Sequence, residues 1–260
     1  MNNQTSLRLN DFLNTYDHSC MNDLLGCIDD RLGSKSLFSY QLDAVRNAMI
    51  TLKHYQDSGE IRYFQDIYGD CNTLAMGDSN KASFCMSTGS GKTVVMVKLI
   101  KELLQAIKNG FIDDKPILTL APNDSILRQI EREMVENDLE AKVLDVDNLK
   151  TRNLADNNVF LCRSDKLGDS KRVCKGVKRI DYHNYLQDDG WYILLYKAHG
   201  NDIEDSKTKS YIRELSRGLY DRKGFIFSFS DTFTDDMDML TCAYSYHNST
   251  SSVTDISKQF

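Results

Sequence analysis

The apolar residues of this chain form short continuous runs that alternate with stretches of helical periodicity. Ser83–Met86 and Ile117–Ala121 are typical of buried strands, and Trp191–Tyr196 is apolar throughout, as a strand covered on both faces should be. Further strands are expected at 141–146, 158–162 and 224–229. The pattern predicts a sheet whose strands are buried along their whole length.

Helical periodicity occupies the intervals between these runs. Phe38–Tyr55 is amphipathic, and Val94–Ile107 carries apolar residues at the spacing of a well-buried helix. A third helix is predicted at Ser125–Val135, with Ser125 or Asp124 as its N-cap. Alternating strands and helices predict an α/β fold with a mostly parallel, doubly wound sheet flanked by helices. Such sheets bind ligands at the carboxyl ends of their strands.

The chain divides into a mixed helical preface at 1–35 and a core at 36–240. Residues 56–80 are polar and are expected to form an insertion or a long loop before the first core strand. A charged helix is expected at 205–220. No low-complexity linker or internal repeat divides the core.

Composition narrows the class of protein. The 260 residues are 41% hydrophobic and 27% charged, which is ordinary for a globular protein with a substantial core. A net charge of −6 disfavours a broadly basic nucleic-acid surface, although local basic patches stay open. Neither a long apolar run nor a signal-peptide core is present, so a cytoplasmic protein without membrane association is expected. Seven cysteines without paired spacing and five scattered histidines indicate reduced thiols instead of disulfides or zinc.

The segment Met86–Thr93 predicts a phosphate-binding loop between a strand and a helix. Met86 occupies the position where this motif usually begins with glycine, so only the G-x-G-K-T part of the chain matches the motif strictly. The residues expected to wrap a polyphosphate are Ser87, Thr88, Gly89, Ser90 and Gly91. Lys92 can reach the outer phosphates, and the Thr93 hydroxyl can ligate Mg²⁺. The alternative is a Gly-Ser loop that contains Lys-Thr by chance.

Four further segments resemble motifs of superfamily 2 helicases. Phe38–Gln41 is similar to the glutamine motif, Ala121–Asn123 to motif Ia, and Ser230–Thr234 to motif III. Trp191–Gly200 aligns with the D-E-A-H Walker B segment of the same proteins. Their order and spacing over about residues 36–240 resemble the Res-type helicase subunits of type III restriction systems.

This resemblance implies an N-terminal RecA-like domain that binds ATP with Mg²⁺ and contacts DNA without sequence specificity. It implies that Gln41 reads adenine, because a side-chain amide offers both a donor and an acceptor. It assigns contacts with the DNA backbone to Pro122 and Asn123. The residues that would couple the ATP site to the DNA face are Ser230, Asp231, Thr232 and His199, although a structural histidine is an open alternative for His199.

The resemblance also implies a partner for this domain. The family binds ATP between two RecA-like domains, and the second supplies arginines that stabilise the transferring phosphoryl group. We expect 241–260 to be a truncated linker toward such a domain, which would be supplied separately or by partner subunits of a restriction-type complex. A basic segment could meet DNA phosphates or could be a solvated loop; its residues are Lys166, Lys171, Arg172, Lys175, Lys178 and Arg179.

The chain departs from the family where Walker B requires Asp-Glu, because it has Tyr196-Lys197. In the family the aspartate holds Mg²⁺ and the glutamate positions or deprotonates the attacking water. Tyrosine is a poor magnesium ligand at neutral pH because its hydroxyl is protonated, and a charged lysine cannot accept a proton. Hydrolysis of ATP is therefore predicted to be absent or severely weakened.

A second departure is Asp231, which replaces the alanine usual in motif III. One hypothesis pairs Asp231 with Lys197 as a compensating ion pair beside the nucleotide site. The rival hypothesis is that Asp231, at the end of the neighbouring strand, binds the metal in place of the Walker B aspartate.

The leading interpretation is an ATP-binding motor domain of a type III restriction-like helicase or translocase with impaired hydrolysis. The alternative is a non-catalytic nucleotide-binding or scaffolding module derived from that family. A small-molecule P-loop kinase fits poorly, because the glutamine and motif Ia segments would then be coincidences.

Overall fold

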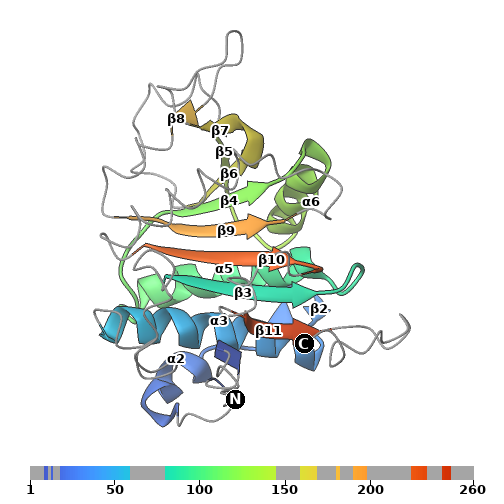
Figure 1. The fold of residues 1–260 in the computed structure, drawn as a ribbon. Coiled ribbons are helices and arrows are strands. Elements are labelled where there is room, and N and C mark those ends of the chain that lie inside the picture. Colours follow the sequence, from blue (N-terminus) through green and yellow to red (C-terminus); the bar gives the residue numbers. More distant parts are fainter. Residues whose placement is uncertain are drawn as a thin grey trace, which may run out of the picture.

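A parallel sheet runs through the centre of the molecule, and Figure 1 shows its strands stacked from β11 to β5. The computed structural model describes residues 9, 10, 13, 18–58, 80–144, 159–168, 180–181, 190–197, 224–232 and 242–246. Within these ranges the sheet has seven strands in the order β11-β3-β10-β9-β4-β6-β5, and each neighbouring pair is parallel. The strands are β3 (Lys81–Met86), β4 (Ile117–Ala121), β5 (Lys142–Val143), β6 (Val159–Arg163), β9 (Tyr192–Tyr196), β10 (Phe225–Ser230) and β11 (Cys242–Tyr246).

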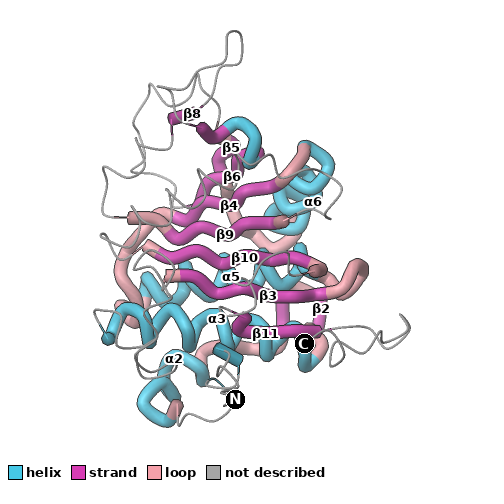
Figure 2. Tube along the Cα trace, viewed as in Figure 1, coloured by secondary structure: helices cyan, strands magenta, loops and turns pink. Residues whose placement is uncertain are grey.

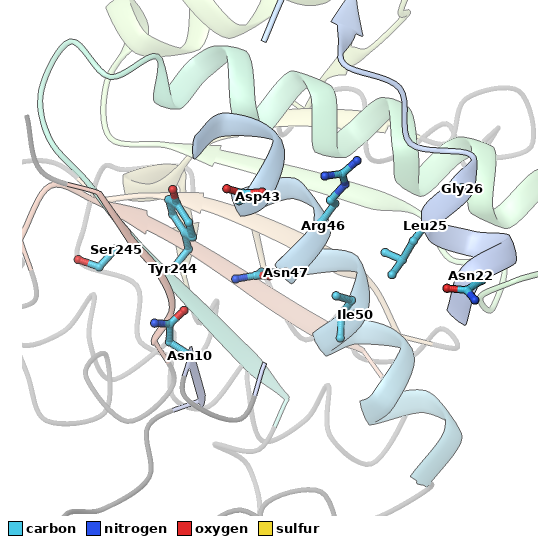
Figure 3. Close-up of a pocket in the computed structure, with 10 residues that line it drawn as sticks. All are labelled: Asn10, Asn22, Leu25, Gly26, Asp43, Arg46, Asn47, Ile50, Tyr244 and Ser245. Carbon is cyan, nitrogen blue, oxygen red and sulfur yellow. The ribbon is translucent and has the colours of Figure 1, made fainter. Parts of the chain in front are cut away.

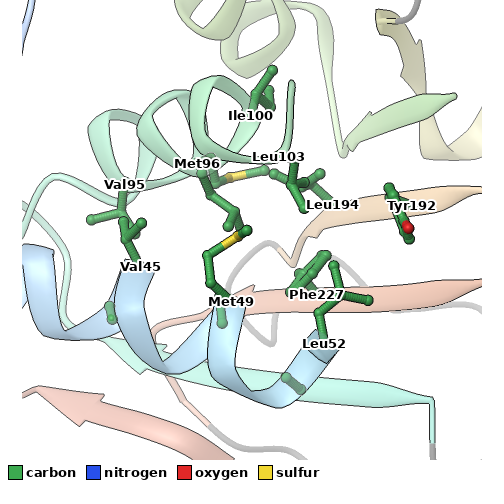
Figure 4. Close-up of a cluster of buried hydrophobic side chains, with 14 of the residues drawn as sticks. Val45, Met49, Leu52, Val95, Met96, Ile100, Leu103, Tyr192, Leu194 and Phe227 are labelled. Atoms are coloured by element: carbon green, nitrogen blue, oxygen red, sulfur yellow. The ribbon is translucent and has the colours of Figure 1, made fainter. Parts of the chain in front are cut away.

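Three helices pack against one face of this sheet: α3 (Ser39–Ser58), α5 (Lys92–Lys108) and α6 (Asp124–Val135). Figure 2 shows their arrangement relative to the strands. Figure 4 shows Met49 of α3 and Met96 of α5 meeting beside Phe227 of the sheet. All three side chains are fully buried, so the apolar stripes predicted for α3 and α5 form the contact between helices and sheet.

The opposite face of the sheet is also apolar. Along β9, Tyr192 and Leu194 belong to the helix-covered core, whereas Ile193 and Leu195 belong to a second buried cluster. Successive side chains of a strand point to opposite faces, so a strand buried on both faces needs an unbroken apolar run. This explains the continuous run at Trp191–Tyr196 and confirms the predicted α/β sheet.

Shorter elements complete the described residues. They are η1 (Ser19–Met21), α2 (Asn22–Gly26), β1 (Arg31–Leu32), β2 (Lys35–Ser36), η5 (Ser164–Lys166), β7 (Leu167–Gly168) and β8 (Ile180–Asp181). The preface thus contains an antiparallel β1–β2 hairpin as well as helix, which its sequence did not suggest. Every described helix is too short or too polar to cross a lipid bilayer.

Two sequence-based expectations are corrected. Residues 242–246, assigned to a linker, form β11, which pairs with β3 at the edge of the sheet. The N-cap of α6 is Asn123, whose side-chain oxygen accepts a hydrogen bond from the Ile126 N–H at 3.0 Å. Three of the predicted features lie outside the described residues: the helix at 205–220, residues 59–79 of the insertion, and His199.

A histidine contact joins the preface to α3 and predicts a pH dependence of stability. His54 Nε2 lies 3.3 Å from His18 Nδ1, and burial together with His18 lowers the pKa of His54 from 6.5 to about 4. The folded chain therefore binds fewer protons than the unfolded chain between these values. The free energy of unfolding should fall as the pH falls through that window, by roughly 2 kcal/mol after allowance for partial solvent exposure.

Urea denaturation at several pH values measures this effect. A His54→Gln variant should flatten the curve between pH 6.5 and 4, because the group whose pKa differs between the two states is gone. An unchanged slope in that variant would assign the pH dependence to other groups.

Candidate nucleotide site

The loop Ser87–Gly91 lies where β3 ends and α5 begins, at the carboxyl edge of the sheet. Gly89 and Gly91 have φ angles of 78° and 84°, a conformation that glycine adopts without steric cost. A Cβ on Gly91 would collide with Nε2 of Gln41, so a side chain here would displace the Gln41 amide from the loop. The loop leads directly into the amino end of a 17-residue helix, whose first N–H groups favour an anion.

The first turn of α3 holds this loop in place. The carbonyl oxygen of Ser90 accepts hydrogen bonds from Gln41 Nε2 and from the Tyr40 hydroxyl, each at 3.0 Å. The Gln41 Oε1 atom accepts a third from the Phe38 N–H, which caps the amino end of α3. Gln41 is 6% exposed and thus binds the loop itself in this structure. Its role in reading adenine stays a prediction.

The end of β11 supports the same loop from another side. The Ser87 N–H donates to the Tyr246 carbonyl oxygen at 3.1 Å. The Tyr246 ring stacks on Tyr40, with centroids 3.7 Å apart, and Tyr40 stacks in turn on Phe38. Sequence reasoning missed Tyr246 because 241–260 had been interpreted as a linker. The alternation of Cys242, Tyr244 and Tyr246 was the available signal for a strand.

Lys92 lies in the floor of the loop. Its Nζ donates to the carbonyl oxygens of Met86 and Ser87 at 2.9 and 3.4 Å. It also lies 5.9 Å from the centroid of the Tyr196 ring, within the range of a cation–π interaction. Burial lowers the pKa of Lys92, and the charge of Asp231 acts in the opposite direction. The ammonium group is therefore held among carbonyl oxygens and over one aromatic face, within the electrostatic influence of the Asp231 carboxylate.

Tyr196 and Lys197 occupy the end of β9, where the Walker B acids were expected. The Lys197 N–H donates to the Phe229 carbonyl oxygen at 2.8 Å, so this segment continues the β9–β10 pairing. Burial raises the pKa of the Tyr196 hydroxyl, and the charge of Asp231 raises it further. The hydroxyl therefore stays protonated at neutral pH, and the phenol is a weaker magnesium ligand here than on an exposed surface.

Asp231 follows β10, which lies between β3 and β9 in the sheet. Its Oδ2 atom accepts a hydrogen bond from the Thr88 hydroxyl at 3.2 Å, and its carbonyl oxygen accepts one from the Cys85 thiol at 3.4 Å. The side chains of Ser230 and Asp231 are buried, and the Ser230 hydroxyl donates to the Thr232 carbonyl oxygen. The structure thus joins the end of β10 to the loop Ser87–Gly91 through Thr88 and Asp231. The pair between Asp231 and Lys197 stays a prediction.

The predicted DNA-contact residues lie at the carboxyl end of β4. Pro122 is half-buried and Asn123 exposed, and the Asn123 side chain caps α6 as described above. Nearby, Arg163 bridges Asp124 and Asp165, with nitrogen–oxygen distances of 2.8 and 2.6 Å. Of the basic segment, Lys166 lies in η5 and the other residues lie outside the described ranges. Contact with DNA stays a prediction.

A polar pocket lies between α2, α3 and β11 (Figure 3). It shares α3 and β11 with the site above, but no residue of the loop Ser87–Gly91 lines it. Its lining residues are Asn10, Asn22, Leu25, Gly26, Asp43, Arg46, Asn47, Ile50, Tyr244 and Ser245. The pocket is therefore separate from the candidate phosphate site.

Residues 34–211 match the model of a family described as the type III restriction enzyme, res subunit. The chain belongs to that family. The part that matches this res-subunit model includes α3, the phosphate loop and β9, whereas β10, Asp231 and β11 lie beyond it. No curated protein matches the chain.

Two solved structures are similar to this member of the res-subunit family. The crystal structure of T4 UvsW aligns with a TM-score of 0.51 and 14% identity, over 89% of this chain and 39% of that chain. The Sulfolobus solfataricus SWI2/SNF2 ATPase core in complex with dsDNA aligns with a TM-score of 0.43 and 18% identity, over 82% of this chain and 36% of that chain. The chain thus spans about two fifths of the length of each. The likeness to UvsW concerns the fold, and the RecA-like fold class is confirmed.

Proposed function

We propose that this chain is the ATP-binding motor domain of a type III restriction-like superfamily 2 DNA helicase or translocase. The observation that carries the proposal is the loop Ser87–Gly91, which brings Lys92 and the amino end of α5 to the carboxyl edge of the sheet. Backbone N–H groups, a helix dipole and one ammonium group together favour a polyphosphate. Membership of the res-subunit family supports ATP as the nucleotide whose phosphates bind at this loop.

The residues of the loop fit a nucleotide. Its two glycines with positive φ keep side chains away from the concave backbone, and Gly89 has open space where a Cβ would lie. The buried Ser90 hydroxyl oxygen has no hydrogen-bond partner among the described residues. Thr93, the second residue of α5, follows Lys92 as in the motif, and we propose that its hydroxyl binds a magnesium ion that accompanies the phosphates. Tyr196 and Lys197 do not fit that cation, for the reasons given above.

We further propose that ATP hydrolysis by this chain is impaired. Attack by water on the γ-phosphate needs a group that orients the nucleophile and accepts its proton. Lys197 cannot do this while charged, and the Tyr196 ring faces the Lys92 ammonium group. The position of these two residues also supports the second candidate, a nucleotide-binding or scaffolding module of the same family that performs no hydrolysis.

The partners belong to this proposal as well. A second RecA-like domain or a partner subunit would complete the ATP site with arginines, and DNA would bind through its backbone at Pro122 and Asn123. The exposed amino end of α6, capped by Asn123, suits a phosphate group at that edge. A cytoplasmic location is proposed from the sequence alone.

Binding of ATP to the unaltered chain and to Lys92→Ala tests the nucleotide site. Loss of the ammonium group removes a charged hydrogen-bond donor to the phosphates, so affinity should fall by about 10- to 100-fold. Titration with a fluorescent ATP analogue measures the change. The control is Lys108→Ala, because Lys108 is exposed at the other end of the same helix.

The two candidates are separated by hydrolysis when DNA and the remaining domain or subunits are supplied. A slow but measurable DNA-stimulated rate supports a weakened motor, and complete absence of turnover supports the scaffolding module. Equal ATP affinity in the unaltered chain and Lys92→Ala would contradict the nucleotide site itself.

A further inference from the structure

We propose that Asp231 is the protein carboxylate that holds the divalent cation of a bound nucleotide, one strand away from the Walker B position. This inference rests on the proposed function, since the cation would arrive with ATP. It concerns a residue beyond the part of the chain that matches the family model. The argument starts from the place of Asp231 in the sheet.

The strand order brings Asp231 to the phosphate loop. β10 pairs with β3 on one side and with β9 on the other, with Ser230 opposite Cys85 and Phe229 opposite Tyr196. The next residue, Asp231, therefore emerges between the phosphate loop and the end of β9. The hydrogen bond from Thr88 fixes its carboxylate against the loop.

The charge of Asp231 affects the pKa values of Lys92 and Tyr196. It opposes the effect of burial on the pKa of Lys92, and it adds to the effect of burial on the pKa of Tyr196. The hydrogen bond from Thr88 thus holds the carboxylate on the loop that also contains Lys92, close enough for its charge to act on the ammonium group. At 7% exposure, the Asp231 carboxylate is buried, so positive charge close to it stabilises the folded chain.

Binding of ATP would change the positive charge that is available to the Asp231 carboxylate. When Lys92 contacts the phosphates, its charge is shared with them, and the Asp231 carboxylate then faces a polyphosphate of the same sign. Like charges on one loop repel each other, and a cation bound with the nucleotide would remove that repulsion. Mg²⁺ suits this position, because it is commonly bound through one or two carboxylates together with substrate phosphates and water.

The other side chains that could bind Mg²⁺ are few, which is consistent with a cation that arrives bound to the nucleotide. In this proposal the hydroxyl comes from Thr93 at the start of α5, and the carboxylate comes from Asp231, which Thr88 ties to the same loop. Within the described residues no group of three or more His, Cys, Asp or Glu side chains could hold a metal on its own. We therefore expect weak binding of Mg²⁺ alone and tight binding in the presence of ATP.

The test compares ATP affinity in Mg²⁺ and in EDTA, measured by fluorescence titration. For the unaltered chain the affinity in Mg²⁺ should exceed that in EDTA by at least about tenfold. In Asp231→Asn this ratio should fall close to one, and the affinity in EDTA should rise because the repelling charge is gone. The control is Asp114→Asn, since Asp114 is exposed before β4 at the opposite edge of the sheet.

A second-site variant sharpens the result. Adding Tyr196→Asp to Asp231→Asn places a carboxylate at the family position, and it should restore the dependence on Mg²⁺. If Asp231→Asn keeps the ratio of the unaltered chain, Asp231 is not the ligand, although the nucleotide site stands. If the unaltered chain binds no ATP under either condition, the proposed function fails and this inference fails with it.

One measurement needs no variant and so does not depend on the folding of Asp231→Asn. Fe²⁺ substituted for Mg²⁺ in the ATP complex, with ascorbate and hydrogen peroxide, generates radicals that cleave the backbone beside the metal. Fragments ending near both Thr93 and Asp231 are expected. Cleavage near Thr93 without cleavage near Asp231 would overturn the assignment.

Discussion

Replacing Lys98 with alanine is expected to destabilise the fold by about 3–5 kcal/mol. Lys98 lies on α5 and is 0% exposed, yet it carries a charge. Its Nζ lies 2.8 Å from Glu102 Oε1 and donates to the Arg31 carbonyl oxygen at 2.8 Å, and it also contacts the Asp29 carboxylate. Truncation would leave Glu102 buried without its cation and would open a cavity under the β1–β2 hairpin.

The double variant Lys98→Met/Glu102→Leu is the matched control. It removes both charges and keeps most of the volume, so its stability should lie close to that of the unaltered chain. Urea denaturation of Lys98→Met, Glu102→Leu and the double variant gives the coupling between the two sites. If Lys98→Ala costs under about 1 kcal/mol, the pair behaves like a surface ion pair and the argument from burial is wrong.

Restoring the Walker B acids with Tyr196→Asp/Lys197→Glu is expected to raise the rate of ATP hydrolysis by about 100-fold or more. The glutamate would regain the task of positioning and deprotonating the attacking water. The aspartate would replace a ring that is held over Lys92, where it cannot bind a cation well. Phosphate release, measured in the presence of DNA and of the second RecA-like domain or partner subunits proposed above, gives the rate for each chain.

The single variants separate the two roles. If Asp231 already holds the cation, Lys197→Glu alone should give most of the increase, and Tyr196→Asp alone should give little. Lys92→Ala in the double variant should return the rate to background, which excludes a contaminating ATPase. A rate in the unaltered chain equal to that of the double variant would show that Tyr196 and Lys197 do not impair hydrolysis.

The site gives a structural task to Gln41, which the sequence assigns to adenine, and adds two tyrosines that the sequence does not assign to any ligand. Gln41 and Tyr40 donate to the same carbonyl oxygen of the phosphate loop, and Tyr246 accepts from its Ser87 N–H. The loop is thereby fixed from α3 and from β11 together. The geometry of the phosphate site therefore depends on an edge strand that follows motif III.

The sequence by itself determined the buried strands of the sheet apart from β11, the helices α3, α5 and α6, and the glycine-containing loop between β3 and α5. Strands β4, β9 and β10 lie within a residue or so of the apolar runs, because a parallel strand buried on both faces tolerates few polar positions. The loop was predictable because G-x-G-K-T encodes local backbone geometry, seen in the positive φ of Gly89 and Gly91. Both signals act over a few neighbouring residues.

Only the tertiary structure decided which distant residues meet at that loop. Gln41 is 49 positions from the carbonyl that it binds, and Asp231 is 143 positions from Thr88. Such contacts follow from the order β11-β3-β10-β9, in which β10 separates the phosphate loop from the Walker B position. Sequence spacing does not encode strand order, because many arrangements bury the same apolar runs. The sequence therefore supplied Asp231 as a substitution, and the sheet placed its carboxylate beside the phosphate loop.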